Sequence, residues 1–112
     1  MNISEKEIEQ MLIAVVKRHG GLCLKWVCPG FAGVPDRICL LPNGRAYFIE
    51  LKRPQGSKTA PRQKWWGDKL KSMNFYHRVI KNAHDIQSFE ARIEKDLYND
   101  RISAIPPSES GH

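Results

Sequence analysis

Two short apolar runs joined by a turn constrain the fold of this chain most strongly. The first run begins at Asp36, the second ends in Glu50 and Lys52, and Asn43-Gly44 lies between them. An Asn-Gly pair between apolar runs is a strong signal for a β-hairpin. Residues i and i+2 of a strand point to the same face, so Glu50 and Lys52 project together, about 6.6 Å apart along the strand. The sequence therefore predicts a hairpin with charged side chains at its open end.

The length of the hairpin loop decides whether Asp36 and Glu50 meet. A two-residue loop at Asn43-Gly44 would pair Asp36 with Leu51 and place Asp36 on the face opposite Glu50. The carboxylates meet only if the loop is one residue longer, if a bulge intervenes, or if Asp36 precedes the regular pairing. A three-residue loop with Gly44 in the left-handed conformation would have this effect. We expect one of these arrangements.

Two adjacent carboxylates and a lysine suit a particular chemistry. Neighbouring carboxylates repel each other unless a cation lies between them, and oxygen ligands suit Mg²⁺ or Mn²⁺ better than zinc. A lysine beside them can orient an attacking water or balance charge on a phosphate. Phosphodiester hydrolysis is the function that this set predicts. The alternative is a surface salt bridge between Glu50 and Lys52, with Asp36 an ordinary turn acid after Pro35.

Composition limits the partners and the compartment. The 112 residues allow one domain, and the formal net charge of +6 favours a polyanionic partner, nucleic acid first. We expect no membrane partner, because the sequence contains no apolar run near the ~20 residues that span a bilayer. The three cysteines, Cys23, Cys28 and Cys39, form no C-x-x-C pair. They predict small buried residues in a reducing compartment, which we expect to be the cytoplasm.

The remaining pattern predicts an alternating α/β chain. A capping box at Ser4 and Glu7 starts the first helix, and Gly20-Gly21 ends it. We expect helices over residues 4–19, 61–73 and 85–97, with Thr59 capping the second, and strands over residues 22–28, 36–41, 46–52 and 75–81. The order α-β-β-β-α-β-α implies a mixed central sheet flanked by helices, since the last strand follows a crossover helix. Residues 1–97 would form the domain and residues 98–112 a flexible tail.

Several polar residues have both a structural and a functional interpretation. Glu9 is either a solvated acid at the border of the first helix's apolar face or a carboxylate aimed into a site. Lys25 is either a phosphate contact or an edge-strand charge that prevents aggregation. Gln63 is either a core-edge amide or a site residue. Lys58 and Arg62 belong either to a basic flap over nucleic acid or to an ordinary solvated loop. The candidate nucleic-acid contacts are Lys25, Arg37, Lys58 and Arg62.

The ordered set of these positions resembles the PD-(D/E)xK nuclease superfamily and, more closely, the VRR-NUC family within it. The resemblance covers roughly residues 5–90, and any one motif alone would be weak. The matching stretches are Ile8-Glu9-x-x-Leu12, Gly20-Gly21, Lys25, Gly33-Val34-Pro35-Asp36, Glu50-Leu51-Lys52 and Gln63. The family often has Ser before the proline of the second helix, where this chain has Ala60.

The resemblance implies a restriction-endonuclease-like α/β fold and a division of roles. The implied metal ligands for Mg²⁺ or Mn²⁺ are Asp36, Glu50 and the Leu51 carbonyl, with Glu9 completing or orienting the metal shell. Lys52 would be the catalytic lysine, and Gln63 would position that lysine or the scissile phosphate.

The same resemblance implies a DNA endonuclease that acts as a homodimer on Holliday-junction or other branched DNA. The candidate dimer contacts are Trp65, Trp66, Phe75 and Tyr76. Two alternatives remain: a nicking or restriction-type nuclease on ordinary duplex, and a non-catalytic nucleic-acid-binding module.

Overall fold

The computed structural model describes residues 3–53 and 59–104 and contains three helices and four strands in the predicted order. The elements are α1 (Glu5–Arg18), β1 (Leu22–Lys25), β2 (Arg37–Leu40), β3 (Ala46–Leu51), α2 (Pro61–Ser72), β4 (Tyr76–Ile80) and α3 (Ala83–Ser103). The expected α-β-β-β-α-β-α fold class is therefore confirmed.

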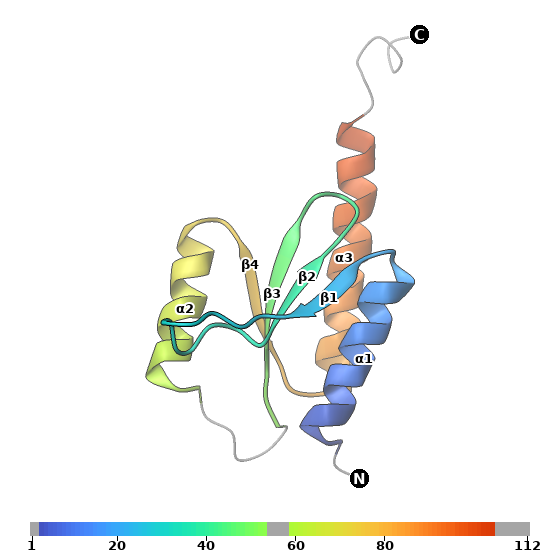
Figure 1. Cartoon of the computed structure of the whole chain (residues 1–112). Helices are drawn as coiled ribbons and strands as arrows, with labels where there is room; N and C mark the ends of the chain where they lie inside the picture. Colours follow the sequence, from blue (N-terminus) through green and yellow to red (C-terminus); the bar gives the residue numbers. More distant parts are fainter. Residues whose placement is uncertain (1–2, 54–58, 105–112) are drawn as a thin grey trace, which may run out of the picture.

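The four strands form one mixed sheet in the order β1-β2-β3-β4 (Figure 1). Strand β2 pairs antiparallel with both β1 and β3. Strand β4 runs parallel to β3, because α2 carries the chain back between them. Helix α1 packs against α3, β1 and β3, whereas α2 packs against β4. The helices thus divide between the two faces of the sheet.

The main core lies between α1, α3 and one face of the sheet. Its members are Ile8, Leu12, Val15, Val16, Cys39, Leu41, Tyr47, Ile49, Leu51, Ile80, Ile86, Phe89 and Ile93. The predicted capping box is present: the Ser4 hydroxyl accepts the Glu7 N–H at 3.1 Å, and the Glu7 carboxylate reaches back to Ser4. Such a cap stabilises a helix by about 1 kcal/mol. The cysteines are free thiols, with Cys39 buried as expected.

The β2–β3 hairpin has a three-residue loop, as one of the predicted arrangements required. Leu41 N donates to Arg45 O at 3.1 Å, which leaves Pro42, Asn43 and Gly44 between the paired residues. Gly44 has a φ of 80°, in the left-handed region that glycine adopts without steric cost. This loop sets the register of every pair further along β2 and β3.

Helix α3 is longer than expected, so the predicted boundary at Leu97 is wrong. The helix continues to Ser103, six residues further. The reason is tertiary: Asp100 accepts hydrogen bonds from Arg45 Nε at 2.6 Å and from Asn43 Nδ2 at 2.9 Å, which ties the last turns to the hairpin loop. Residues 105–112 of the predicted tail lie outside the described residues. No helix within the described ranges is long and apolar enough to cross a membrane.

Two other element ends differ from the expectation. Strand β1 ends at Lys25 instead of Cys28, because its pairing with β2 stops after the bond from Trp26 N to Asp36 O and the chain then turns at Cys28. Helix α2 is capped at Ala60, so the predicted Thr59 cap is wrong. Alanine offers no side-chain acceptor, and Gln63 Oε1 instead accepts the Ala60 N–H at 3.3 Å.

Candidate active site

Asp36 and Glu50 lie opposite each other on β2 and β3. The register pairs Arg37 with Ile49, so the next position pairs Asp36 with Glu50. Hydrogen-bonded pairs alternate along an antiparallel ladder, and the bond between Leu41 and Arg45 places Asp36 and Glu50 at a non-hydrogen-bonded position. Cα atoms at such positions are about 4.5 Å apart, closer than at the hydrogen-bonded ones. The two carboxylates therefore meet on the sheet face that carries α2.

Pro35 explains how the end of this ladder differs from a regular sheet. The register would pair Pro35 with Leu51, but proline has no N–H to donate. On the opposite strand, Leu51 N donates to Asp36 Oδ2 at 2.7 Å. The acceptor at this position is therefore the Asp36 side chain and not a backbone carbonyl of the ladder. The Leu51 carbonyl receives no donor from position 35. The Leu51 carbonyl directly follows Glu50 in β3, and Pro35 cannot occupy it.

Glu50 is a buried acid with one satisfied oxygen. Only 1% of the residue is exposed, and its Oε1 accepts a hydrogen bond from Gln63 Nε2 at 3.0 Å. Within the described part of the chain, Oε2 has no hydrogen-bond partner. Burial, reinforced by the neighbouring Asp36, raises the pKa of Glu50 to about 8, and the Lys52 charge opposes this rise. A cation beside Glu50 would stabilise the ionised carboxylate and so lower its pKa.

Gln63 connects the acid to the lysine. Its Oε1 accepts a hydrogen bond from Lys52 Nζ at 2.6 Å, while its Nε2 donates to Glu50. One amide orientation thus satisfies an ammonium and a carboxylate that are two residues apart on β3. The first turn of α2 supplies this residue, because Pro61 starts the helix two residues earlier. The predicted Asp36, Glu50, Lys52 and Gln63 set is therefore assembled in one place.

The loop between β1 and β2 packs tightly on the start of α2. Trp66 Nε1 donates to Ala32 O at 3.2 Å. Gly33 has a φ of 85°, and a Cβ there would lie 2.6 Å from the Arg62 Cβ. Only glycine allows the loop this close. The contact fixes the loop that leads into Asp36 against the helix that carries Gln63.

Glu9 lies on the other side of the sheet. Its Oε2 is 3.2 Å from Arg37 NH2, and Arg37 alternates with Asp36 along β2, so the two residues point to opposite faces. The acid of α1 whose negative charge contributes to the raised pKa of Glu50 is Glu5. Glu5 is not among the site residues expected from the sequence. The signal that could have found it is spacing, because Glu5 and Glu9 share one side of α1.

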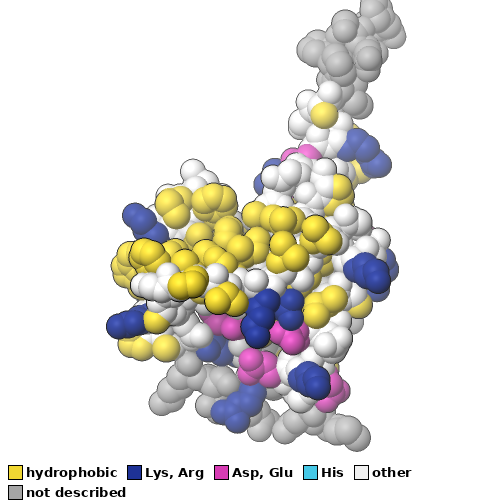
Figure 2. All heavy atoms as spheres, in the orientation of Figure 1, with side chains coloured by type: hydrophobic (Ala, Val, Ile, Leu, Met, Phe, Trp, Pro, Cys, Tyr) yellow, Lys and Arg dark blue, Asp and Glu magenta, His cyan; other side chains and the backbone are white. Residues whose placement is uncertain are grey.

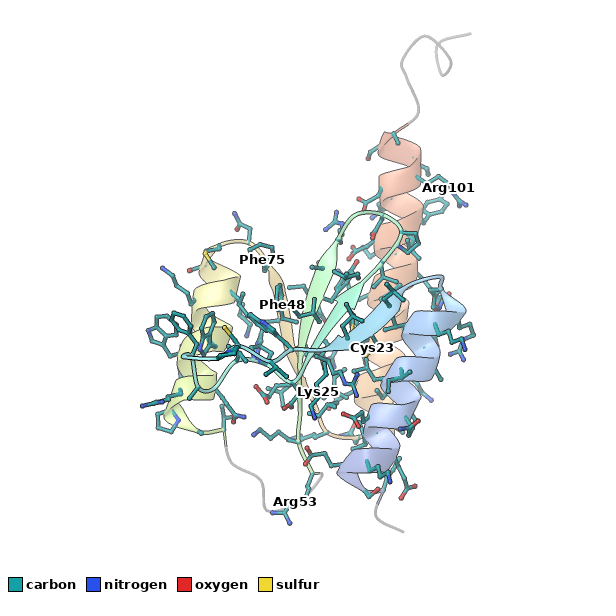
Figure 3. The ribbon with its side chains drawn as sticks, in the orientation of Figure 1. Cys23, Lys25, Phe48, Arg53, Phe75 and Arg101 are labelled. Atoms are coloured by element: carbon teal, nitrogen blue, oxygen red, sulfur yellow. The ribbon has the colours of Figure 1, made fainter. Side chains whose placement is uncertain are left out.

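The candidate nucleic-acid contacts differ in how available they are. Lys25, at the end of β1 (Figure 3), and Arg62, at the start of α2, are exposed. The Arg37 side chain is only 15% exposed, and besides Glu9 it donates to Cys23 O at 3.2 Å. Lys58 lies outside the described residues. Two of the four predicted basic side chains are therefore free to face a ligand.

A separate cluster of possible metal ligands occurs between α1 and α3. Among the described residues, His19, Glu90 and Glu94 bring one ligand atom each within 4.8 Å of one another. Arg18 and His19 already contact Glu90 Oε2 at 2.7 and 2.8 Å. This cluster is accounted for as an ion-pair network. At Glu50, by contrast, a buried carboxylate oxygen has no hydrogen-bond partner among the described residues, and such oxygen atoms fit a hard divalent cation.

The comparisons with known proteins agree on the fold. A solved structure described as a VRR_NUC domain superposes with a TM-score of 0.71 at 23% sequence identity, covering 75% of this chain and 90% of that one. The fold of this chain is therefore that of a VRR_NUC domain, and the fold that the sequence resemblance implied is confirmed. No family profile matches the chain.

One curated phage protein is similar to part of this chain in sequence. Over 61 residues the chain is 48% identical to the putative nuclease p44 of Acyrthosiphon pisum secondary endosymbiont phage 1. The match covers 54% of this chain and 64% of that protein's length, so the chain spans slightly less than two thirds of this relative.

Proposed function

We propose that this protein is a divalent-metal-dependent DNA endonuclease that hydrolyses phosphodiester bonds. The observation that carries the proposal is the connected set in which Gln63 bonds both Lys52 and the buried Glu50 while Asp36 lies opposite Glu50. A salt bridge between Glu50 and Lys52, the structural alternative, would not need Gln63 between them. It would also leave the unpartnered Glu50 Oε2 unexplained.

The residues that would hold Mg²⁺ or Mn²⁺ are Asp36, Glu50 and the Leu51 carbonyl. Their oxygen atoms match the preference of these ions. Such an ion, when bound, lowers the pKa of a coordinated water and polarises the phosphate. Glu9 acts on this set from a distance, since its ion pair holds Arg37, the residue after Asp36.

Lys52 and Gln63 prepare the reacting groups. Gln63 Oε1 holds the Lys52 ammonium in place, which puts a positive charge where negative charge develops on the phosphate during attack. The same amide orients Glu50 through its Nε2. Because one side chain positions both groups, a small shift of α2 would disturb the ammonium and the carboxylate together.

The substrate that we propose is branched DNA, and the cleaving species is a homodimer. The chain carries a net charge of +6, and Lys25 and Arg62 are exposed. Lysine and arginine contacts to phosphates are expected to dominate the affinity and to weaken with salt. One site cleaves one strand, so paired cuts in a four-way junction require two sites related by a two-fold axis.

The decisive experiment compares three labelled DNAs of matched sequence: a four-way junction, a duplex and a single strand. Each is incubated with the protein and Mg²⁺ or Mn²⁺, beside an EDTA lane and the Lys52→Ala variant. Paired cuts on the junction alone, lost in both controls, are the expected result.

The other outcomes identify the alternatives. Equal cleavage of all three DNAs would retain the catalytic site and reject junction selectivity. Cleavage of duplex alone would favour a nicking or restriction-type nuclease. Tight DNA binding without cleavage, with Mg²⁺ and with Mn²⁺, would refute the nuclease proposal and favour a non-catalytic nucleic-acid-binding module.

A further inference from the structure

Two of the three cysteines face each other across β1 and β2. The strand register pairs Cys23 with Cys39, and the Cys39 thiol donates a hydrogen bond to the Cys23 sulfur at 3.9 Å. Both residues are free thiols. Neither belongs to the candidate active site, so the proposed function leaves this pair without a role.

The outer face of β1 shows on which side of the sheet the pair lies. Figure 2 shows apolar side chains gathered over this part of the sheet, and Leu22 and Leu24 of β1 are 60% and 44% exposed. Successive residues of a strand point to opposite faces, so Cys23 points toward α1, the helix that packs on β1 (Figure 3). Cys23 is half-buried there and packs against the main core, in which Cys39 is fully buried.

The pairing of the two cysteines suits a disulfide because of its place in the ladder. Trp26 N donates to Asp36 O at 3.0 Å, and hydrogen-bonded pairs alternate, so Cys23 and Cys39 occupy a non-hydrogen-bonded position. Cα atoms at such positions lie about 4.5 Å apart, within the range of about 4.4 to 6.8 Å that disulfides span. The sulfurs need to approach by about 2 Å to reach the bond length of ~2.05 Å. Rotation of the two side chains supplies this movement while the strands keep their register.

The surroundings of Cys23 favour the thiolate, which is the reactive form of cysteine. The hydrogen bond from Cys39 lowers the pKa of Cys23, burial opposes this effect, and the Arg37 charge adds to the lowering against the Glu9 charge. Arg37 NH1 also donates to Cys23 O at 3.2 Å, which holds the guanidinium beside the pair. Donating the hydrogen bond, together with burial, raises the pKa of Cys39. Cys23 is therefore the sulfur that reacts first, and Cys39 is the sulfur that resolves the product.

We propose that Cys23 and Cys39 form a redox-active dithiol that a peroxide closes into a disulfide between β1 and β2. The Cys23 thiolate attacks one oxygen of hydrogen peroxide, the O–O bond breaks, and the departing hydroxide takes up the thiol proton to become water. The Cys39 sulfur then attacks the sulfenic acid at Cys23, the S–S bond forms, and the S–O bond breaks. The second hydroxide leaves with the Cys39 proton as water. The two sulfurs lose two electrons to the peroxide, and a thiol reductant reverses the reaction.

The disulfide would close the loop that leads into the candidate active site. Cys23 and Cys39 are 16 positions apart, and the segment between them includes Gly33, whose close contact with Arg62 fixes the approach to Asp36. A crosslink over a loop of this length restricts the unfolded chain and so favours the folded state. We therefore expect the oxidised protein to be more stable than the reduced protein. This inference concerns the thiols alone and does not depend on the nuclease activity.

Peptide mapping tests the pairing directly, because trypsin cleaves after Lys25, Arg37 and Arg45 and so leaves each cysteine on a separate peptide, 19–25, 26–37 or 38–45. Reduced and desalted protein is treated with a small excess of hydrogen peroxide. Its intact mass should fall by about 2 Da, the mass of the two hydrogens lost. After alkylation with iodoacetamide and digestion without reductant, peptides 19–25 and 38–45 should be joined and peptide 26–37 should carry the alkyl group. Dithiothreitol added before alkylation should restore the separate peptides.

Single variants separate the roles of the three cysteines. Cys28→Ser is the matched control and should form the same bond as wild type. Cys23→Ser and Cys39→Ser should not form it, and Cys23→Ser keeps the test interpretable if the change in the core at Cys39 unfolds the protein. Oxidation in urea shows whether the folded sheet selects the pair. In the unfolded chain, proximity favours a bond between Cys23 and Cys28, which are five positions apart.

Thermal melts measure the consequence of the bond. Oxidised wild type should melt about 10 °C above the reduced protein, and Cys28→Ser should show the same rise. Cys23→Ser should show none. A disulfide that includes peptide 26–37 in the folded protein would overturn the proposal. So would two free thiols at Cys23 and Cys39 after Cys28 has been oxidised, or an oxidised protein that melts below the reduced one.

Discussion

Asp36 lies opposite Glu50 because Pro42 joins Asn43 and Gly44 in a three-residue hairpin loop. With a two-residue loop, Asp36 would pair with Leu51 and point away from Glu50. The observed register pairs Arg37 with Ile49, and Gly44 has the positive φ that the longer loop requires. The length of the hairpin loop thus decides whether two carboxylates can share a cation.

Removing the Lys52 amine should abolish cleavage without unfolding the protein. Lys52 is half-buried, and its Nζ bonds Gln63 at 2.6 Å. We expect Lys52→Ala to reduce the single-turnover cleavage rate by about 10³-fold or more, because the positive charge at the phosphate is lost. DNA affinity, measured by fluorescence anisotropy in Ca²⁺, should change little. Lys95→Ala, an exposed lysine on α3, should cleave like wild type. Unfolding of Lys52→Ala would support a structural salt bridge instead.

Removing the Gln63 amide should lower the cleavage rate more than it lowers the affinity for DNA. In Gln63→Ala, Glu50 Oε1 and Lys52 Nζ lose their shared partner. Residues that orient metal ligands typically contribute 10- to 100-fold, so a fall in cleavage rate of about that size is expected. Gln87→Ala, at an exposed position of α3, serves as the control. An unchanged rate in Gln63→Ala would remove Gln63 from the mechanism.

The metal-free protein should lose stability as the pH rises from about 5 to 8. The pKa of Glu50 is about 8 in the fold against 4.5 unperturbed, so between these values the folded state holds a proton that the unfolded state has released. Stability is therefore greatest below the unperturbed pKa and falls toward pH 8. Glu50→Gln should remove this contribution and be more stable than wild type at pH 7.5 in EDTA, by about 1 to 3 kcal/mol. Thermal melts of both proteins across this pH range test it, and parallel curves would contradict it.

Glu5 and Glu9 of α1 should respond differently to substitution. The Glu5 charge contributes to the raised pKa of Glu50, whereas Glu9 pairs with Arg37 on the opposite face. We expect Glu5→Gln to change Mn²⁺ affinity several-fold at low salt, with little effect on stability. Glu9→Gln should lower the free energy of unfolding by about 1 kcal/mol, because it leaves the half-buried Arg37 without its acid. Titration calorimetry and urea unfolding separate the two effects; a reversed pattern would assign Glu9 directly to the metal shell.

Two glycines with the same backbone conformation offer a matched test of the loop contact. Gly33 and Gly30 both have a φ of 85°, but a Cβ would meet Arg62 at Gly33 and nothing within 4 Å at Gly30. Each alanine substitution should cost about 1 kcal/mol for the left-handed conformation. Gly33→Ala should cost roughly 1 to 3 kcal/mol more, because the loop must move away from α2. Urea unfolding of both variants measures the difference, and equal losses would contradict the close packing.

Local patterns were sufficient for most of the fold. The capping box at Ser4, the apolar stripe of α1 and the Asn43-Gly44 turn each depend on residues close together in the sequence. Element ends were predicted less well. Helix α3 passes Leu97 because Asp100 bonds Arg45, a residue 55 positions earlier, and no local pattern contains that contact.

The sequence by itself determined the element order, the type of each element and the identity of the acids, the lysine and the glutamine that could form a site. These follow from strand and helix periodicity and from the chemistry of the side chains. Only the tertiary structure decided that Asp36 faces Glu50, that Gln63 reaches both Glu50 and Lys52, and that Glu9 turns to Arg37 while the Glu5 charge reaches Glu50. It also decided that α2 packs against β4, on the sheet face opposite α1 and α3. The physical reason is that register, helix docking and burial depend on contacts between residues distant in the chain, which periodicity does not encode.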